Sequence, residues 1–278
     1  LSARGGKFRA TRYARVIGGM AANAALAAAR LGAAAELWTF TGRDRAGDEI
    51  LAGLSAEGVD VRAAVRTDHA SFVSSVLIDD AGERAVFARI DDRAFRTDAD
   101  LPLDTLGHFD AVHADCRWVP ATLKTLAAAR AKGLPTVLDA EPTPAEALYA
   151  MAAHATHTFF SEPGLAAMAA GNDHETALRT VSAHCGDVVG VTLGARGVIW
   201  LEHGAIHRCP APQVAVVDTL GAGDVFHGAI AVALAEGMRA PQAVRFASAS
   251  AALKCTRFGG GSAAPARAEV EALLARWT

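Results

Sequence analysis

The chain has 278 residues, of which 51% are hydrophobic and 21% charged, so it can bury a large core and is not mainly disordered. Its formal net charge of −3 argues against a protein that binds nucleic acid through bulk positive charge. Its 4 cysteines include no C-x-x-C pair, which argues against a zinc ribbon or a disulfide framework and favours a reducing, cytoplasmic compartment. The length predicts one α/β domain with an additional element.

The longest apolar stretch covers residues 18–42 and is interrupted by Asn23, Arg30 and Glu36. It therefore does not predict a membrane span, and no signal peptide is visible. The sequence starts at Leu1 without a methionine, so we expect the native N-terminus to be missing.

The first sixty residues begin an alternation of strands and helices. Polar and apolar residues alternate around 8–16, which indicates a strand. An alanine-rich helix follows Gly18-Gly19 and ends near Leu31-Gly32, where glycine favours a helix end. Residues 36–41 then favour a strand, and residues 44–57 favour a helix.

A β-rich region interrupts this alternation. The runs 71–79 and 84–90 flank the sequence Asp-Ala-Gly-Glu, which is typical of a hairpin. Together with the N-terminal strand, this region predicts a small β lid over a larger core. The predicted boundaries are residues 1–17 and 61–96 for the lid, and residues 18–60 and 97–278 for the α/β core.

The rest of the chain has the rhythm of βαβ units. Short apolar runs separated by helical patterns cover residues 111–114, 136–139, 158–160 and 188–192, and a further β-rich stretch covers 198–207. Helical patterns at the end of the chain cover residues 221–236, 241–256 and 267–277. The pattern predicts an α/β fold with a doubly wound, mostly parallel sheet and helices on both faces.

The segment 216–228 carries the strongest chemical signal. It predicts a strand end, a glycine-rich turn and a helix that begins near Gly223. The backbone N–H groups of residues 221–224 would point into one concavity, which suits an anion. Asp224 would place a carboxylate beside that anion, as phosphoryl transfer from a hydroxyl acceptor requires. The alternative is an ordinary glycine turn, with Asp224 as a helix-start residue.

Two other phosphate-binding motifs are excluded by their spacing. A dinucleotide-binding fingerprint needs a glycine where Phe226 stands, and the P-loop string is absent.

Two stretches resemble the signatures of a known family. Residues 218–224 (DTLGAGD) are similar to the C-terminal signature of the ribokinase/PfkB carbohydrate kinases, and residues 18–23 (GGMAAN), running into 29–32, are similar to their N-terminal signature. The βαβ body, the β lid and residues 191–197 (VTLGARG) also fit. The resemblance implies a ribokinase-like fold and a sugar kinase that uses ATP and Mg²⁺.

The resemblance also implies roles for single residues. Asp224 resembles the base that deprotonates the acceptor hydroxyl, and Gly221, Ala222 and Gly223 resemble the anion hole. Lys254 lies in a stretch that resembles the region flanking the adenine. By position, the residues expected at the ATP site are Thr192, Gly194, Gly197 and Lys254, and those expected at the sugar site are Gly18, Gly19 and Asn23.

Finer similarity points to a subgroup. Residues 115–118 (DCRW), 160–165 (FSEPGL) and 245–257 resemble sulfofructose kinases and, more distantly, ketohexokinases. Met20 stands where many relatives have a sugar-binding asparagine, which puts a ribose-type set of contacts in doubt.

The stretch that begins at Ser161 departs from the ribokinase N-x-x-E motif, because its acid, Glu162, is displaced. Glu162 is therefore only a weak candidate for contact with magnesium-bound water. The first core strand, which often supplies an aspartate to the sugar, is expected to precede Leu1.

Arginines suggest how an anionic sugar could be recognised. Arg117 follows a predicted strand, and the carboxyl ends of parallel strands line the ligand crevice. A second group of cations lies in the lid segments, where it serves either anion recognition or protection of a solvated strand edge. These cations are Arg4, Lys7, Arg9, Arg12, Arg15, Arg84, Arg89, Arg93 and Arg96.

The 10 histidines do not form a recognisable metal-binding motif, since no H-E-x-x-H string occurs. His227 lies three residues after Asp224, and we expect it to pack or to orient neighbouring groups rather than to react.

We therefore expect an ATP-dependent kinase that phosphorylates a primary hydroxyl of a ketose or an anionic ketose derivative, with 6-deoxy-6-sulfofructose as the best acceptor. The alternatives are a fructokinase-, ketohexokinase- or ribokinase-like enzyme, or a sugar- or nucleotide-binding sensor on the same fold. An oxidoreductase is disfavoured by the failed fingerprint. A homodimer that forms through the β lid is a further expectation.

Overall fold

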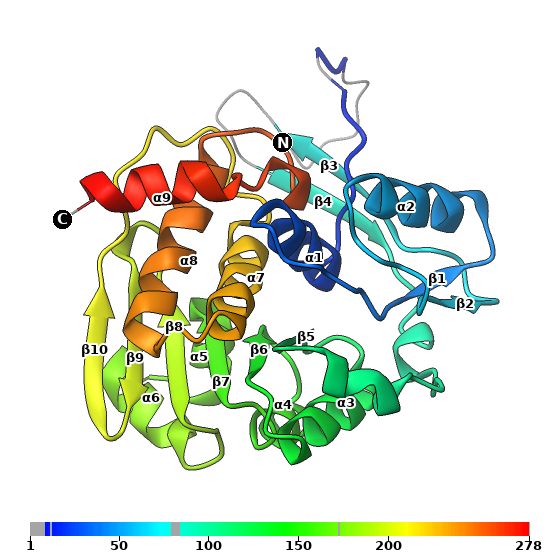
Figure 1. The fold of residues 1–278 in the computed structure, drawn as a ribbon. Helices are drawn as coiled ribbons and strands as arrows, with labels where there is room; N and C mark the ends of the chain where they lie inside the picture. The colour runs from blue at the N-terminus through cyan, green and yellow to red at the C-terminus, as the bar shows by residue number, and fades with distance from the viewer. Residues whose placement is uncertain (1–8, 12, 79–83, 172, 278) are drawn as a thin grey trace.

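A six-stranded sheet lies at the centre of the structure, a computed structural model that describes residues 9–11, 13–78, 84–171 and 173–277. The strand order is β10-β9-β8-β7-β6-β5; β5 to β8 run parallel, whereas β9 and β10 are antiparallel to their neighbours (Figure 1). The strands are β5 (Val112–Asp115), β6 (Thr136–Ala140), β7 (His157–Ser161), β8 (Val188–Thr192), β9 (Val198–Glu202) and β10 (Ala205–Cys209).

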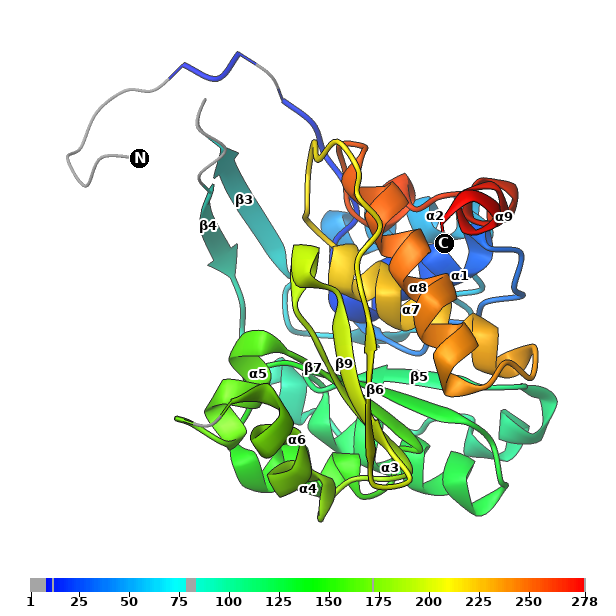
Figure 2. The same cartoon turned by 90° about the vertical axis from the view of Figure 1, so that its left-hand side faces the viewer.

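Helices cover both faces of this sheet (Figure 2). One face carries α1 (Met20–Arg30), α7 (Ala222–Ala235) and α8 (Ala240–Cys255), with α9 (Arg267–Arg276) packed on α8. The other face carries α3 (Val119–Ala131), α4 (Ala145–Ala152), α5 (Glu162–Met168) and α6 (His174–Ser182). Short 3₁₀ turns are η1 (Ala94–Arg96), η2 (Leu103–His108), η3 (Gly194–Arg196) and η4 (Gly261–Ala263).

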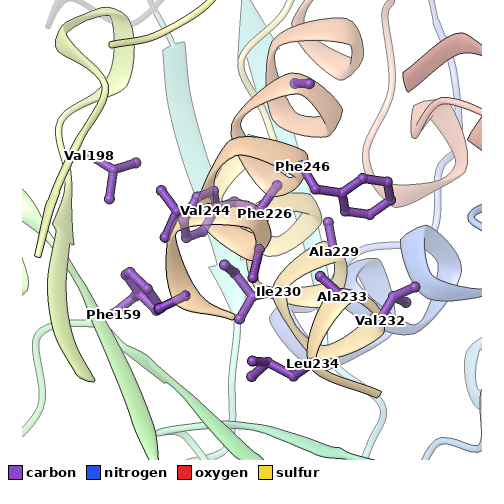
Figure 3. Packing of buried hydrophobic residues seen from close by; sticks show 14 of the residues in the cluster. Phe159, Val198, Phe226, Ala229, Ile230, Val232, Ala233, Leu234, Val244 and Phe246 are labelled. Atoms are coloured by element: carbon purple, nitrogen blue, oxygen red, sulfur yellow. The ribbon is translucent and has the colours of Figure 1, made fainter. Parts of the chain in front are cut away.

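The larger hydrophobic core lies between the sheet and the pair α7 and α8. Phe159 of β7 and Val198 of β9 face Phe226 and Ile230 of α7 and Val244 of α8 (Figure 3). All five side chains are buried, and burial of one such side chain contributes about 1.5–3 kcal/mol. This packing fixes α7, and with it the glycine turn that precedes α7, against the sheet.

Small residues let α1 and α7 approach closely. A Cβ atom on Gly228 of α7 would lie 2.4 Å from the carbonyl oxygen of Ala24, so glycine is required at this crossing. The alanine-rich sequence of α1 suits the same close packing. As a result, the first turns of two helices that are far apart in sequence lie side by side.

Two further pairs of strands lie outside the main sheet. The strands β1 (Phe40–Gly42) and β2 (Val65–Thr67) are parallel, and α2 (Arg45–Ala56) follows β1. The strands β3 (Val73–Ile78) and β4 (Arg84–Arg89) form an antiparallel hairpin that extends away from the core layers (Figure 2).

The predicted fold class is confirmed, as are the hairpin and the helices at the C-terminal end. The strand predicted over 8–16 is wrong for the residues described there, since 9–11 and 13–16 belong to no strand. Tyr13 and its described neighbours in this stretch are exposed and pair with no strand. The strand predicted over 36–41 is shorter and shifted, beginning at Phe40, with only an isolated bridge from Glu36 to Asp60.

No strand precedes the glycine turn, contrary to prediction. The N–H groups of Val217 and Asp218 donate to the carbonyl of Cys255 at the end of α8 and not to a neighbouring strand, and Pro210 and Pro212 lie just upstream. In the part of the chain that the structure describes, no helix has the length and apolar character needed to cross a membrane.

Candidate active site

Four adjacent strands end at one edge of the sheet and bring polar side chains together there. Asp115 ends β5 and pairs in register with Asp139 of β6, while Ser161 ends β7 and pairs with Thr192, the last residue of β8. The helix α7 packs against β5 and β6. Ligands of open α/β sheets bind outside the carboxyl ends of the strands, so this edge is the candidate site.

The glycine turn before α7 is held by Asp218 and Lys254. Asp218 accepts hydrogen bonds from the N–H of Leu220 at 2.9 Å and from that of Gly259 at 3.1 Å. Burial opposes ionisation, but these bonds and the Lys254 ammonium, 3.5 Å away, hold the pKa of Asp218 below its usual value. The Lys254 ammonium also donates to the carbonyl of Asp218 at 2.9 Å. The turn is thus a rigid loop tied to residues 259–261.

Lys254 is fully buried beneath this turn. The structure therefore places its ammonium against Asp218 and not at an open surface where adenine would bind. On this geometry Lys254 supports the turn.

The turn leaves N–H groups free at the start of α7. Gly221 has a φ of 77°, which suits glycine, and it caps the helix. Among the described residues, the N–H groups of Gly221, Gly223 and Asp224 have no backbone or side-chain acceptor, whereas that of Ala222 donates to Thr219 at 3.2 Å. A Cβ on Gly223 would meet nothing within 4 Å. We call these three N–H groups the N–H cradle; an anionic oxygen fits the open space in front of it.

Asp224 lies at the edge of this cradle and has an unusual environment. Its Oδ2 accepts a 2.6 Å hydrogen bond from the Nδ2 of Asn23. Burial raises the pKa of Asp224 to about 6, the Asn23 hydrogen bond lowers it, and the negative charges of Asp115 and Glu141 raise it further. A carboxylate with a pKa just below neutral is well matched to accept a proton at physiological pH.

Asn23 links the two signature stretches. Its side chain is 5% exposed, and while Nδ2 donates to Asp224, Oδ1 accepts a 2.8 Å hydrogen bond from the N–H of Gly261. The sequence predicted Asn23 at the sugar, but the structure directs both of its polar atoms to protein groups. Its geometry is that of a residue that orients the Asp224 carboxylate.

The other predicted sugar-site residues line the same cleft as Asp224. Gly18 is exposed, and Gly19, with a φ of 107°, precedes α1. Asp115 accepts from the N–H of Ala21 at 3.2 Å and from that of Arg117 at 2.8 Å, and burial raises its pKa. The Arg117 side chain is exposed and has no partner within the described residues. Carboxylate and guanidinium groups are thus both available to a polar ligand.

The residues predicted to contact ATP fall into two kinds. Thr192 ends β8, and Gly194 is exposed with a φ of 56°, so both lie at the ligand edge of the sheet. Gly197 is buried, and a Cβ there would lie 2.1 Å from the carbonyl oxygen of Cys209. The structural requirement for glycine at 197 is therefore this close approach to the chain after β10.

Glu162, the weak metal candidate, is held by cations. Its carboxylate pairs with Arg196 at 2.6 Å and with His174 at 3.0 Å, and the hydrogen bond from Arg196 lowers its pKa. Within the described ranges, no group of three or more His, Cys, Asp or Glu residues could hold a metal ion. The protein side chains seen here therefore do not fit a metal site of their own.

The cations of the lid segments are mostly engaged or outside the described part. Arg15 pairs with Glu49, and Arg93 with Asp91. Arg9, Arg89 and Arg96 are exposed. Arg4, Lys7 and Arg12, and the side chain of Arg84, fall outside what the structure describes. Among the cations of the described residues, Arg9, Arg15 and Arg117 line the cleft, and Arg117 lies beside Asp115 at the end of β5.

The sequence interpretation gave no role to Asp115, Asp139 or Glu141. Asp115 and Asp139 each lie at the carboxyl end of a predicted strand. This position indicates a residue of the ligand crevice, as it does for Arg117, so it could have identified both aspartates.

Comparison with known proteins agrees with this geometry. Residues 2–267 match the model of the pfkB family carbohydrate kinases. The ribokinase of Bacillus subtilis is 30% identical over 274 residues, which cover 95% of this chain and 89% of that protein. A ribokinase-type protein of Agrobacterium tumefaciens has 37% identity and a TM-score of 0.95, with coverage of 100% of this chain and 92% of that one.

A ribokinase of Arabidopsis thaliana, solved with ribose and ATP, shares the fold with a TM-score of 0.82 at 21% identity, covering 100% of this chain and 93% of that one. On the family match and the similarity to the Bacillus subtilis ribokinase, the chain belongs to the pfkB family of carbohydrate kinases.

Proposed function

We propose that this protein transfers the γ-phosphoryl group of ATP to a primary hydroxyl of a sugar, with Asp224 as the general base. The observation that carries the proposal is the position of Asp224: it lies at the start of α7, beside free N–H groups, and in the same cleft as Asp115 at the end of β5. A base and an anion-binding cradle on one helix turn are the two groups that the reaction needs.

The proposed reaction uses these groups together. Asp224 accepts the proton of the sugar hydroxyl, and the hydroxyl oxygen forms a bond to the γ-phosphorus as the bond from that phosphorus to the bridging oxygen breaks. ADP leaves, and the N–H cradle stabilises the charge on the transferring group. Since the pKa of Asp224 is about 6, activity should be lost as the pH falls through that value.

ATP and Mg²⁺ are the proposed cofactors. The N–H groups of Gly221, Gly223 and Asp224, and the open space at Gly223, fit phosphate oxygens. Mg²⁺ would neutralise phosphate charge, but Glu162 is paired with Arg196 and offers it no free ligand. The intact base argues against the alternative of a binding sensor, and ATP turnover with any sugar would exclude that alternative.

The finer proposal concerns the acceptor, for which we favour an anionic ketose derivative such as 6-deoxy-6-sulfofructose. The exposed Arg117 guanidinium supports it, because such a group forms paired hydrogen bonds with a sulfonate or phosphate. The nearby carboxylates of Asp115 and Glu141 favour the competing acceptors, neutral ketoses and ribose, whose hydroxyls donate to carboxylates.

A kinase assay over fructose, fructose 6-phosphate, tagatose 6-phosphate, ribose and sulfofructose separates these acceptors. Loss of a charge-assisted contact costs about 1.5–3 kcal/mol, so kcat/KM for sulfofructose should exceed that for fructose by about tenfold or more. Arg117→Ala should reduce that ratio and leave the neutral sugar nearly unaffected. A better rate with fructose or ribose, and a ratio unchanged by Arg117→Ala, would show that Arg117 is only a surface charge.

We further propose that two copies of the chain associate through the lid hairpin. Phe87, Leu77 and Val73 share one face of β3 and β4, and Val86, Val76 and Ile78 share the other. Phe87 is 63% exposed and Val86 59%. Residues of both faces line the cleft, but Phe87 does not, so this exposed aromatic side chain is available to a second copy. Sedimentation should show a dimer that Phe87→Glu or Val86→Glu converts to a monomer; a wild-type monomer would refute the proposal.

A further inference from the structure

A buried polar pair lies directly beneath the proposed catalytic turn. His227 follows Asp224 by about one helical turn, and its side chain points from α7 to the sheet, where it meets Asp139 of β6. Each residue is 2% exposed. Neither residue lines the cleft, so neither can touch a substrate there.

The His227 ring joins three elements. Its Nδ1 lies 2.8 Å from the carbonyl oxygen of Gly223 and 3.2 Å from Oδ2 of Asp139, and its Nε2 lies 3.2 Å from the carbonyl oxygen of Phe159. Gly223 belongs to the N–H cradle, Asp139 to β6 and Phe159 to β7. The imidazole therefore ties the first turn of α7 to the carboxyl ends of two strands.

Stability alone does not account for this pair. The ring packs among apolar groups, close to Phe159 and Phe226, where an aliphatic side chain would bury without any polar cost. Oδ1 of Asp139 is buried with no hydrogen-bond partner, as is Nε2 of the neighbouring His113. A buried polar pair with an unsatisfied oxygen is a poor source of stability, so its use must lie elsewhere.

Burial favours the uncharged form of each member of the pair. It lowers the pKa of His227 to about 4, and burial together with the Asp224 charge raises that of Asp139 well above its usual value. The other titratable groups around them are His113 and Asp115 on β5, Glu141 after β6, and Asp224 itself.

We propose that His227 and Asp139 are positioning residues for phosphoryl transfer: the imidazole holds the Gly223 peptide, and the carboxyl group orients the imidazole. Because the Gly223 N–H belongs to the cradle and Asp224 is the next residue, a shift of this peptide moves both groups that act on the reacting atoms. The inference rests on the function proposed above, but its effect on ATP affinity can be measured without turnover.

Three substitutions at 227 test which contact matters. His227→Leu removes both contacts with little change in volume. His227→Asn keeps a donor that can reach the Gly223 carbonyl, whereas His227→Gln keeps one that can reach the Phe159 carbonyl. Since misplacement by about 1 Å can cost about 10²-fold, we expect His227→Leu to lower kcat by about 10–10²-fold, with the sugar KM within about twofold. His227→Asn should restore more activity than His227→Gln.

The Asp139 contact can be tested in the same way. Asp139→Asn, which still accepts a hydrogen bond from the ring, should have a kcat nearer that of wild type than Asp139→Leu.

A matched control is His157, a half-buried histidine that begins β7 at the opposite end of the sheet. His157→Leu makes the same chemical change far from the cradle, and it should leave kcat unchanged. The double variant His227→Leu with Gly223→Ala should lower kcat by less than the product of the two single fold-changes, because both substitutions act on one peptide.

The proposal is wrong if His227→Leu keeps kcat within about twofold, or if the losses of the double variant add. It is equally wrong if a folded His227→Gln is as active as His227→Asn. If wild type phosphorylates no sugar, the proposed acceptor chemistry is wrong, and titration with ATP then tests the positioning role of His227. Weaker ATP binding by His227→Leu but not by His157→Leu supports this role. Equal binding by the two variants refutes it.

Discussion

The pKa of Asp224 can be moved through Asn23 without a change in the base itself. The Nδ2 of Asn23 donates a 2.6 Å hydrogen bond to Oδ2 of Asp224 and thereby favours the ionised form. Asn23→Ala removes that donor. Asn23→Asp also removes it, but keeps the oxygen that accepts from Gly261. In both variants the pKa of Asp224 must rise, because the carboxylate loses a stabilising contact.

The size of the shift follows from the strength of the lost bond. A hydrogen bond to a charged group contributes about 1.5–3 kcal/mol, and one pKa unit corresponds to about 1.36 kcal/mol. The pKa of Asp224 should therefore rise from about 6 to about 7–8. At pH 7 the ionised fraction would then fall by about two- to tenfold, and it would recover near pH 9. Asn23→Asp should shift further, because a second carboxylate adds repulsion.

The assay is kcat/KM for the preferred sugar from pH 5 to pH 9, with ATP saturating. Wild type should lose activity below about pH 6, and the acidic limb of each variant should lie about one to two units higher. An acidic limb that stays at the wild-type position in both folded variants would refute the link between Asn23, Asp224 and the reaction.

Three other substitutions test the turn. Gly223→Val should keep the melting temperature but lower kcat by about 10²-fold or more, since its side chain fills the open space of the cradle; unchanged ATP turnover would show that the loop is only a turn. Gly221→Ala must hold a φ of 77°, so chemical unfolding should show a loss of about 1–3 kcal/mol, and no loss would contradict the strained geometry. Lys254→Met should destabilise the protein by about 3–5 kcal/mol in urea, because Asp218 loses its buried cation; an effect near zero would argue against that support.

Periodicity and turn chemistry predicted most of the fold. The short apolar runs between helical patterns became β5 to β8, and the Asp-Ala-Gly-Glu stretch lies between the paired strands β3 and β4. These features depend on local sequence, since a strand, its crossover helix and its neighbour follow one another along the chain. Strands were predicted over 8–16 and before the glycine turn, because polar and apolar residues alternate there, but no strand forms. Neither segment has a partner strand, and strand pairing is a property of the whole fold.

The sequence offered single residues as candidates for the site, but it could not predict their partners. The motif around Gly221 and Asp224 is local, so its chemistry can be read from spacing alone. The bond from Asn23 to Asp224 joins residues 201 positions apart and depends on how closely α1 crosses α7. The same holds for Asp139 and His227, which only the packing of α7 on the sheet brings together. Lys254 is a further example, because its burial against Asp218 depends on the packing of α8 against the turn before α7.

The proposed role of Asp224 as the base can be tested by the turnover of Asp224→Asn beside wild type, with ATP and the best sugar of the panel. The substitution keeps the shape and removes the base. The account predicts that kcat falls by about 10²–10⁴-fold, while the affinity for ATP, measured by calorimetry, stays within about twofold of wild type. Near-normal turnover in the folded variant would contradict the account, because the proton of the acceptor would then leave by another route.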